Sequence, residues 1–248
     1  MFNDKKNLKE FSDRLKIIDL KPLIKKHALP IFGVGNAIAF SKFIALNKRI
    51  MSGSYMLINA HNKKLKDPFG TNIKDPVWFR AMCLEFAFEA YTKVNDYIYQ
   101  ILYYNFELYK ILDKRQILKN TDVVELSKTI NYDKKRLIRK LLKSKGESVN
   151  NFIKLLKSYQ KYIYKYNITE IANDFKHRGA YSIRGTNIPR IKFEVKNQNI
   201  DINDILSESI IEMDIEIEKL VILHQETIKI VNELYNLCFR YSVNFNKS

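Results

Sequence analysis

Apolar residues recur every three or four positions along most of this chain, the spacing that places them on one face of an α-helix. The pattern predicts helical segments at residues 5–20, 31–50, 77–113, 132–144, 149–165, 168–179 and 204–240. The segment 77–113 contains neither Gly nor Pro and follows Asp75-Pro76, which suit an N-cap and a first helical turn. Because apolar residues cover more than one of its faces, we expect a central helix that is contacted from several sides.

Residues 190–196 depart from this pattern. Ile191, Phe193 and Val195 alternate with polar residues, as they do in a β-strand. The sequence offers no clear partner strand, so we expect an arm that lies at an edge or pairs across a dimer. The predicted fold class is therefore all-α: a bundle of long antiparallel helices with a short extended arm or strand near 190–196.

Turn-forming residues separate the start of the chain from the rest. Asp67-Pro68, Gly70 and Asp75-Pro76 mark a turn-rich connection. We therefore predict an N-terminal helical extension at 1–74 and a helical bundle at 75–248. Gly33 and Gly35 do not indicate a nucleotide-binding loop, because Ile38 stands where the third Gly would be and no strand precedes them.

The composition is that of a folded protein with long regular elements. Apolar residues make up 46% and charged residues 28% of the 248 residues, with only 7 Gly and 5 Pro. The two cysteines, Cys83 and Cys238, lie in apolar helical patterns and predict buried thiols in a reducing compartment. No signal-peptide pattern opens the chain, and the longest apolar run, 31–46, is short and interrupted by polar residues. We expect a cytoplasmic protein that does not cross a membrane.

Positive charge changes this picture, because it favours a polyanionic partner such as RNA. The net charge is +16, and residues 132–165 hold eleven Lys and Arg residues against two acids, Asp133 and Glu147. Lys135, Arg139 and Lys140 are the candidates for phosphate contacts. Two simpler causes of this charge stay open: such a run is usually a solvated helix face, and an A/T-rich genome enriches lysine without any ligand.

The candidate chemistry lies in the short helix 168–179. Asn167 suits its N-cap and Gly179 its end. Apolar residues gather on one face of this helix, while Asn173 and His177, one turn apart, fall on the other. Lys176 lies beside them. An amide, an imidazole and an ammonium group held together in this way suit phosphate binding or proton transfer.

At these residues the chain resembles the HEPN superfamily, helical bundles that include many metal-independent ribonucleases of toxin–antitoxin and antiphage systems. The family signature is Arg, then Asn, Asp or His, then three to five residues, then His. Asn173 and His177 match it, while Ala172 stands at the Arg position. The resemblance covers about residues 75–240 and implies a HEPN-like bundle, a homodimer, RNA as substrate, and an antitoxin or another defence protein as a possible partner.

The resemblance implies RNA cleavage by attack of a 2′-OH on its adjacent phosphate, without a metal or other cofactor. His177 would be the general acid or base, and Asn173 would orient His177 or a phosphate oxygen. Ala172 cannot supply the family's guanidinium, so Lys176, Arg178 or Arg184 would have to stabilise the phosphate. Arg178 lies about 100° from His177 around the helix.

Two competing functions follow from the same residues. A non-catalytic HEPN-like module would bind RNA or a partner protein through Lys135, Arg139 and Lys140 without using His177. A structural helical adaptor would bind no RNA. The remaining polar residues have simpler interpretations: His224 as a core or interface residue, and His61 as a solvated loop residue. The acids of 208–218 would solvate the surface or pair with the lysine-rich helices.

Overall fold

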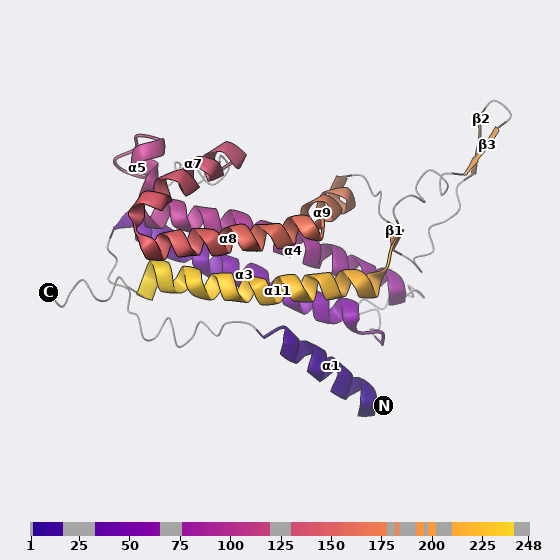
Figure 1. The fold of residues 1–248 in the computed structure, drawn as a ribbon. Coiled ribbons are helices and arrows are strands. Elements are labelled where there is room, and N and C mark those ends of the chain that lie inside the picture. The colour runs from indigo at the N-terminus through magenta and orange to yellow at the C-terminus, as the bar shows by residue number, and fades with distance from the viewer. Residues whose placement is uncertain are drawn as a thin grey trace. The chain divides into compact units, whose positions relative to one another are not determined.

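The computed structural model describes residues 2–16, 33–64, 76–119, 130–177, 182–183, 192–195, 198–201 and 210–240. The helices are α1 (Phe2–Arg14), α3 (Val34–His61), α4 (Pro76–Asn105), α5 (Leu108–Leu112), α7 (Tyr132–Leu142), α8 (Glu147–Lys165), α9 (Ile168–His177) and α11 (Met213–Tyr235). A 3-10 turn, η1 (Lys143–Lys145), follows α7, and a π-helical turn, η3 (Asn236–Arg240), follows α11. The strands are β1 (Ser182–Ile183), β2 (Lys192–Val195), β3 (Gln198–Asp201) and β4 (Ile210–Ile211) (Figure 1).

The described part of the chain is mostly helical, which confirms the predicted all-α class. Helix-breaking residues are scarce, with 7 Gly and 5 Pro in the whole sequence. Long helices are therefore possible, because few residues interrupt them: α3 has 28 residues and α4 has 30. Among the described residues, none of the helices is long and apolar enough to span a membrane.

Two compact units divide the chain, and each takes residues from both sides of position 74. Unit 1 comprises Met1–Lys16, Ser52–Thr92 and Ile163–His224, and unit 2 comprises Ile17–Met51, Lys93–Tyr162 and Gln225–Ser248. The long helices α3, α4, α8 and α11 contribute residues to both units. The predicted division at residue 74 therefore does not coincide with the boundary between compact units.

In unit 1, α3 and α4 run antiparallel at close range. A Cβ atom on Gly53 would lie 3.1 Å from the Ala90 Cβ, so the missing side chain lets the two helices approach. Further along α3, the Ala60 carbonyl accepts a 2.6 Å hydrogen bond from Nε of Arg80. The earlier of the two contacts along α3 meets the later position on α4, and the later contact meets the earlier position, as expected for antiparallel helices.

Helix α1 packs onto unit 1 through contacts at its C-terminal end. The ring of Phe11, which is 5% exposed, stacks on His61 with centroids 3.8 Å apart. Arg14 forms an ion pair with Glu218, and His224 Nε2 lies 3.2 Å from the Lys16 carbonyl. The interpretation of His61 as a solvated loop residue is therefore wrong, because it ends α3 and packs against an aromatic ring.

The prediction that His224 is a core residue is confirmed. Its side chain is 1% exposed, and its Nδ1 lies 2.7 Å from the hydroxyl of Tyr91, which is fully buried. The predicted burial of Cys83 and Cys238 is confirmed as well. Burial raises the pKa of the Cys83 thiol to about 11, so at neutral pH it is protonated and a poor nucleophile.

In unit 2, α8 and the second part of α11 also run antiparallel, because Phe152 near the start of α8 lines one pocket with Glu233 near the end of α11, while a residue further along α8 contacts an earlier one on α11. The Tyr159 and Thr227 hydroxyls hydrogen-bond at 3.1 Å. Near the start of α3, a Cβ atom on Gly35 would lie 2.7 Å from the Tyr104 carbonyl, a close approach that only Gly permits. Phe43 contacts the ring of Phe239, with centroids 5.4 Å apart.

The extended arm expected near 190–196 is a strand, and it has a partner that the sequence did not reveal. β2 pairs antiparallel with β3, with Lys192 opposite Asp201 and Val195 opposite Gln198. β2 thus pairs within the chain and needs no partner strand across a dimer. Only two residues separate it from β3, so the two strands form a hairpin. β1 and β4 form a separate parallel pair.

Several helix boundaries differ from prediction. The helix expected over 5–20 ends at Arg14, and the helix expected over 31–50 continues to His61. The helix expected over 77–113 ends at Asn105, because Glu107 adopts a left-handed conformation (φ 49°) before α5 begins. This break brings Tyr109 back toward Tyr103, with ring centroids 6.2 Å apart. The helix expected from residue 204 begins at Met213, after β4, and residues 202–209 lie outside the described part of the chain.

We expect the free energy of unfolding to fall as the pH is lowered from about 7.5 to about 5.5. Burial lowers the pKa of His224 and, although Asp214 opposes it, the pKa of His61. Below about pH 6.5 the unfolded chain therefore binds protons that the folded protein does not, and stability is lost. Urea denaturation at several pH values measures this. The His224→Gln variant has no titrating group at this position, so it should lose less stability than the wild-type protein over the same pH range. An equal loss in the two proteins would contradict the role of His224.

Candidate functional site: a basic groove between α7 and α8

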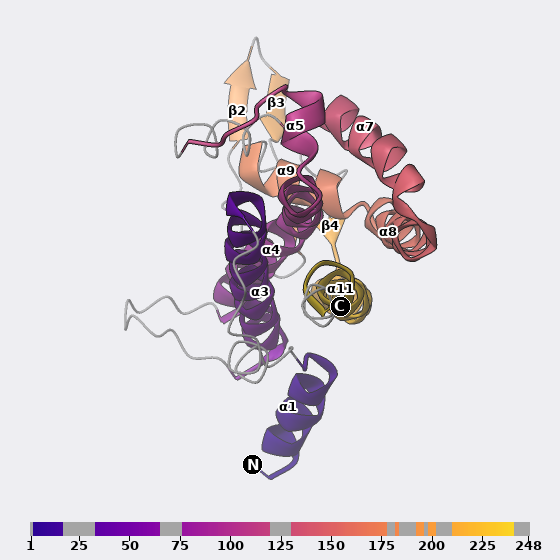
Figure 2. The ribbon, with the colours of Figure 1, turned by 90° about the vertical axis from the view of Figure 1, so that its left-hand side faces the viewer.

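Helix α7 begins at a well-formed cap and leads directly into α8. The Asn131 side chain accepts a 3.0 Å hydrogen bond from the Lys134 backbone N–H, the interaction of an N-cap. After η1, Gly146 turns the chain with φ 114°, a conformation that favours glycine, and α8 follows (Figure 2). The predicted segments 132–144 and 149–165 are thereby confirmed, although α8 starts at Glu147.

Cations on one side of α7 bind it to α4 and to the chain that follows α4. Lys135 forms an ion pair with Asp96, and Lys134 Nζ lies 2.7 Å from Asp113. The Lys134 ammonium also lies 5.1 Å from the centre of the Tyr103 ring, within cation–π range. Burial and the hydrogen bond to Asp113 raise the pKa of Tyr103, so its hydroxyl remains a donor.

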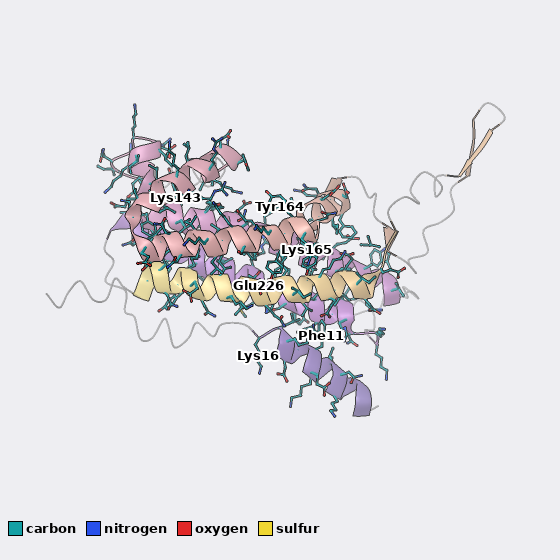
Figure 3. The ribbon with its side chains drawn as sticks, in the orientation of Figure 1. Phe11, Lys16, Lys143, Tyr164, Lys165 and Glu226 are labelled. Atoms are coloured by element: carbon teal, nitrogen blue, oxygen red, sulfur yellow. The ribbon has the colours of Figure 1, made fainter. Side chains whose placement is uncertain are left out.

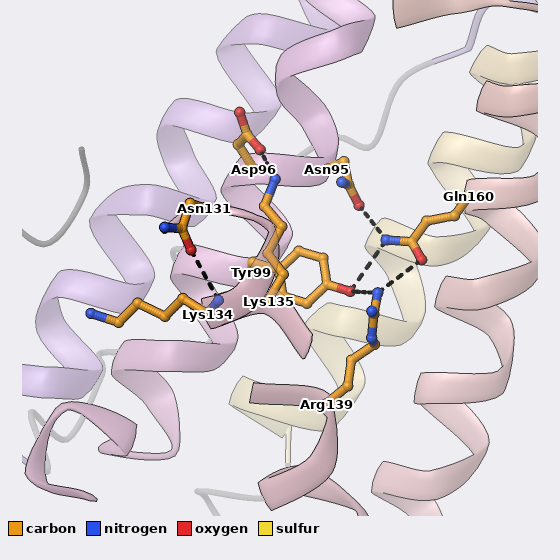
Figure 4. Close-up of polar contacts among 8 residues, drawn as sticks. All are labelled: Asn95, Asp96, Tyr99, Asn131, Lys134, Lys135, Arg139 and Gln160. Carbon is orange, nitrogen blue, oxygen red and sulfur yellow. Dashed lines mark hydrogen bonds and ion pairs between the residues drawn. The ribbon is translucent and has the colours of Figure 1, made fainter. Parts of the chain in front are cut away.

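A second set of polar contacts holds Arg139. Its Nη1 donates to the Tyr99 hydroxyl at 2.8 Å and to Gln160 Oε1 at 3.3 Å (Figure 4). Gln160 Nε2 in turn donates to Asn95 Oδ1 at 3.1 Å, which fixes the orientation of the Gln160 amide. The guanidinium of Arg139 is therefore held in place by side chains from α4 and α8.

A groove of about 640 Å³ lies over α7 and α8. Its described lining consists of Tyr132, Asp133, Arg136, Leu137, Arg139, Lys140, Lys143 and Lys157. Five of these residues are cations and one is an acid, so the described lining of the groove has a surplus of positive charge. Such a surface attracts phosphate groups.

The structure places the three predicted phosphate-binding cations of this region in different settings. Lys140 is exposed and lines the groove, and Arg139 also lines it while bound to Tyr99 and Gln160. Lys135 is paired with Asp96 and is not part of the groove's described lining. Its position on α7 therefore serves the attachment of the helix to α4.

The structure orients α9 as the sequence pattern indicates. The helix spans Ile168–His177, with Ile168 and Ile171 buried and Asn173 and Lys176 exposed. The His177 side chain lies outside the described part of the structure, as do Arg178 and Arg184. α9 belongs to unit 1 and α7 to unit 2, so the two sets of predicted site residues belong to different compact units.

Several groove residues were not singled out from the sequence. At about 100° per residue, one stripe of α7 and η1, within about 60° of arc, holds Tyr132, Arg136, Arg139 and Lys143. Arg139 in this stripe was predicted, and the i, i+4, i+7, i+11 spacing is the signal that could also have identified Tyr132, Arg136 and Lys143. No sequence pattern relates Lys157 to this stripe, because it comes from α8.

No metal centre emerges from the described residues: they contain no group of three His, Cys, Asp or Glu side chains placed to hold an ion. The acids at the start of α11 have other contacts. Asp214 pairs with Lys63 at 3.2 Å, and Glu216 pairs with Lys219 at 2.6 Å. These two acids therefore form ion pairs, but with a lysine that follows α3 and a lysine of α11, and not with the lysine-rich helices of 132–165.

Replacing Lys135 with Met should lower the free energy of unfolding by about 0.2–1 kcal/mol, the usual value of a partly exposed ion pair. The Lys135 side chain is 17% exposed and that of Asp96 is 44% exposed, so solvent screens the pair only in part. Lys140→Met, on the exposed side of α7, is the matched control and should change stability by less than about 0.5 kcal/mol. Urea denaturation of both variants measures the difference, and equal effects would contradict the structural role of Lys135.

Comparison with known proteins does not assign the chain to a family. No protein-family model matches it, and neither a curated protein nor a solved structure does. The resemblance to the HEPN superfamily therefore stays a prediction that rests on Asn173 and His177.

Proposed function

We propose that the protein binds RNA through the groove over α7 and α8. The observation that carries this proposal is the asymmetry of charge: five cations line the groove, and Asp133 is the one acid in its described lining. Phosphate contacts from Lys and Arg release counterions, supply essentially all of the non-specific affinity of proteins for nucleic acids and contribute a large share of the specific affinity. A local surplus of cations at a concave surface therefore favours a polyanion over a small neutral ligand.

The pairing of the neighbouring acids supports the same proposal. Asp96 and Asp113 could have neutralised the basic residues of α7, but they pair with Lys135 and Lys134 on the side that faces α4. Arg136, Lys140 and Lys143 are exposed in the groove. Lysines that merely keep a surface solvated do not need this separation of charge.

A second candidate function is the metal-independent ribonuclease activity implied by the HEPN resemblance. The exposure of Asn173 and Lys176 on α9, opposite its buried apolar face, supports it, because a phosphate could reach both side chains. In this proposal His177 takes or gives the proton, Asn173 orients it, and Lys176, Arg178 or Arg184 stabilises the phosphate. The groove would then hold the RNA rather than cut it.

Further proposals follow from the same resemblance. We propose a homodimer, a cytoplasmic location, and a role in a toxin–antitoxin or antiphage system with an antitoxin or another defence protein as partner. The alternative is a non-catalytic HEPN-like module in which the groove binds RNA and α9 has no chemical role.

Removing two exposed groove cations should weaken RNA binding about tenfold or more. In Arg136→Gln with Lys143→Gln, two phosphate contacts are lost, so the slope of log K against log[salt] should decrease by about 1.4 for a single strand. Fluorescence anisotropy with a labelled RNA at several NaCl concentrations measures affinity and slope together.

The matched control is Lys9→Gln with Lys93→Gln, two exposed lysines that are not in the described lining of the groove. It lowers the net charge by the same amount and should retain the affinity of the wild-type protein to within about twofold. If both double variants lose the same RNA affinity, net charge and not the groove determines binding. An absence of RNA binding by the wild-type protein would rule out the proposed function.

For the ribonuclease candidate, incubation of RNA with the purified protein in EDTA should yield fragments with 2′,3′-cyclic phosphate ends. His177→Ala should slow cleavage by about 10²–10⁴-fold, the usual contribution of a general acid or base. Asn173→Ala should slow it less. Glu170→Ala, an exposed residue on the same helix, is the control and should leave the rate unchanged. Intact RNA with the wild-type protein would contradict catalysis while leaving the groove proposal untouched.

A further inference from the structure

An exposed aromatic ring stands among the groove's cations. Tyr132 is the first residue of α7, lines the groove and is 67% exposed. Exposing a large aromatic side chain to water costs free energy that packing would recover, as the buried Tyr99 and Tyr103 show on α4. A ring in this position is available to stack on a ligand.

The groove's cations follow this ring along α7, and one of them, Arg139, is held in place. Arg139 lies seven residues after Tyr132 on the same stripe of α7, about 10 Å along the helix axis at 1.5 Å per residue. Its Nη1 is occupied by Tyr99 and Gln160. The guanidinium is therefore held in a set orientation, and Arg139 lines the groove together with Arg136 and Lys143.

A stacking ring next to a row of cations distinguishes between forms of nucleic acid. In a duplex both faces of each base are covered by its neighbours, so a tyrosine at the surface reaches only phosphates and sugars. In a single strand, bases can stack on aromatic side chains while the backbone follows a basic groove. The combination at this site matches the second arrangement.

From these contacts we infer that the groove takes a single-stranded segment, with one unpaired base stacked on Tyr132 and the adjoining phosphates on Arg139, Arg136 and Lys143. This inference rests on the proposed RNA-binding function and adds the form of RNA that the groove selects. It assigns to Tyr132 the role of the base-stacking residue and to Gln160 that of a residue which positions Arg139.

The test compares a single-stranded RNA of about 12 nucleotides with the same sequence as a duplex, at one salt concentration and with the full-length protein. The single strand should bind at least about tenfold more tightly. With 2-aminopurine placed at successive positions of the single strand, one position should show fluorescence quenching on binding, because stacking on a tyrosine quenches it.

Variants at Tyr132 separate stacking from charge. Tyr132→Ala should abolish the quenching and weaken single-strand binding about fivefold or more, while the salt slope stays unchanged because no phosphate contact is lost. Tyr132→Phe keeps the ring and should behave as the wild type. Tyr164→Ala, which removes a tyrosine that is 72% exposed on α8 and outside the groove's described lining, is the control (Figure 3).

The possible results decide the inference one way or the other. Equal or tighter binding of the duplex, or unchanged quenching and affinity in Tyr132→Ala, would overturn it while the groove would still bind RNA. If neither RNA binds, the proposed function itself fails. Preference for the single strand that depends on Tyr132 but not on Tyr164 would establish the stacking site.

Discussion

The candidate RNA-binding surface depends on the polar attachment of α7 to α4 and to Asp113, which follows α5. Lys135 pairs with Asp96, Lys134 pairs with Asp113, and Arg139 donates to the Tyr99 hydroxyl. These contacts determine the rotation of α7 about its own axis. They therefore decide which of its basic residues face inward and which line the groove. Without them the helix would still be amphipathic, but its exposed cations would have no defined arrangement.

This attachment matters because α7 has little apolar contact of its own. Its buried residues are Ile138 and Leu142, which together contribute only about 3–6 kcal/mol by burial. The ion pairs and cation–π contacts of Lys134 and Lys135 are partly shielded from water, so salt screens them less than exposed pairs. The basic residues of α7 thus have two roles: those on its inner side attach the helix, and those that line the groove are placed to bind a polyanion.

The two candidate sites belong to different compact units and use different physical chemistry. The groove in unit 2 would act by positive charge and stacking, with no proton transfer. The α9 helix in unit 1 presents an exposed amide and ammonium group and ends at His177, the residue suited to acid–base chemistry. Binding and cleavage are therefore separable proposals, since neither requires the residues of the other.

Local patterns in the sequence determined the helical class, the extent of α7 and α9, and the burial of Ile168, Ile171 and His224, because periodicity and capping act over a few residues. They could not show that the helix over 77–113 breaks at Glu107, which depends on packing of Tyr109. Only the tertiary structure decided which cations of 132–165 are bound internally and which line the groove. Their partners, Asp96, Tyr99 and Gln160, lie on other helices far along the chain, where no local pattern can identify them.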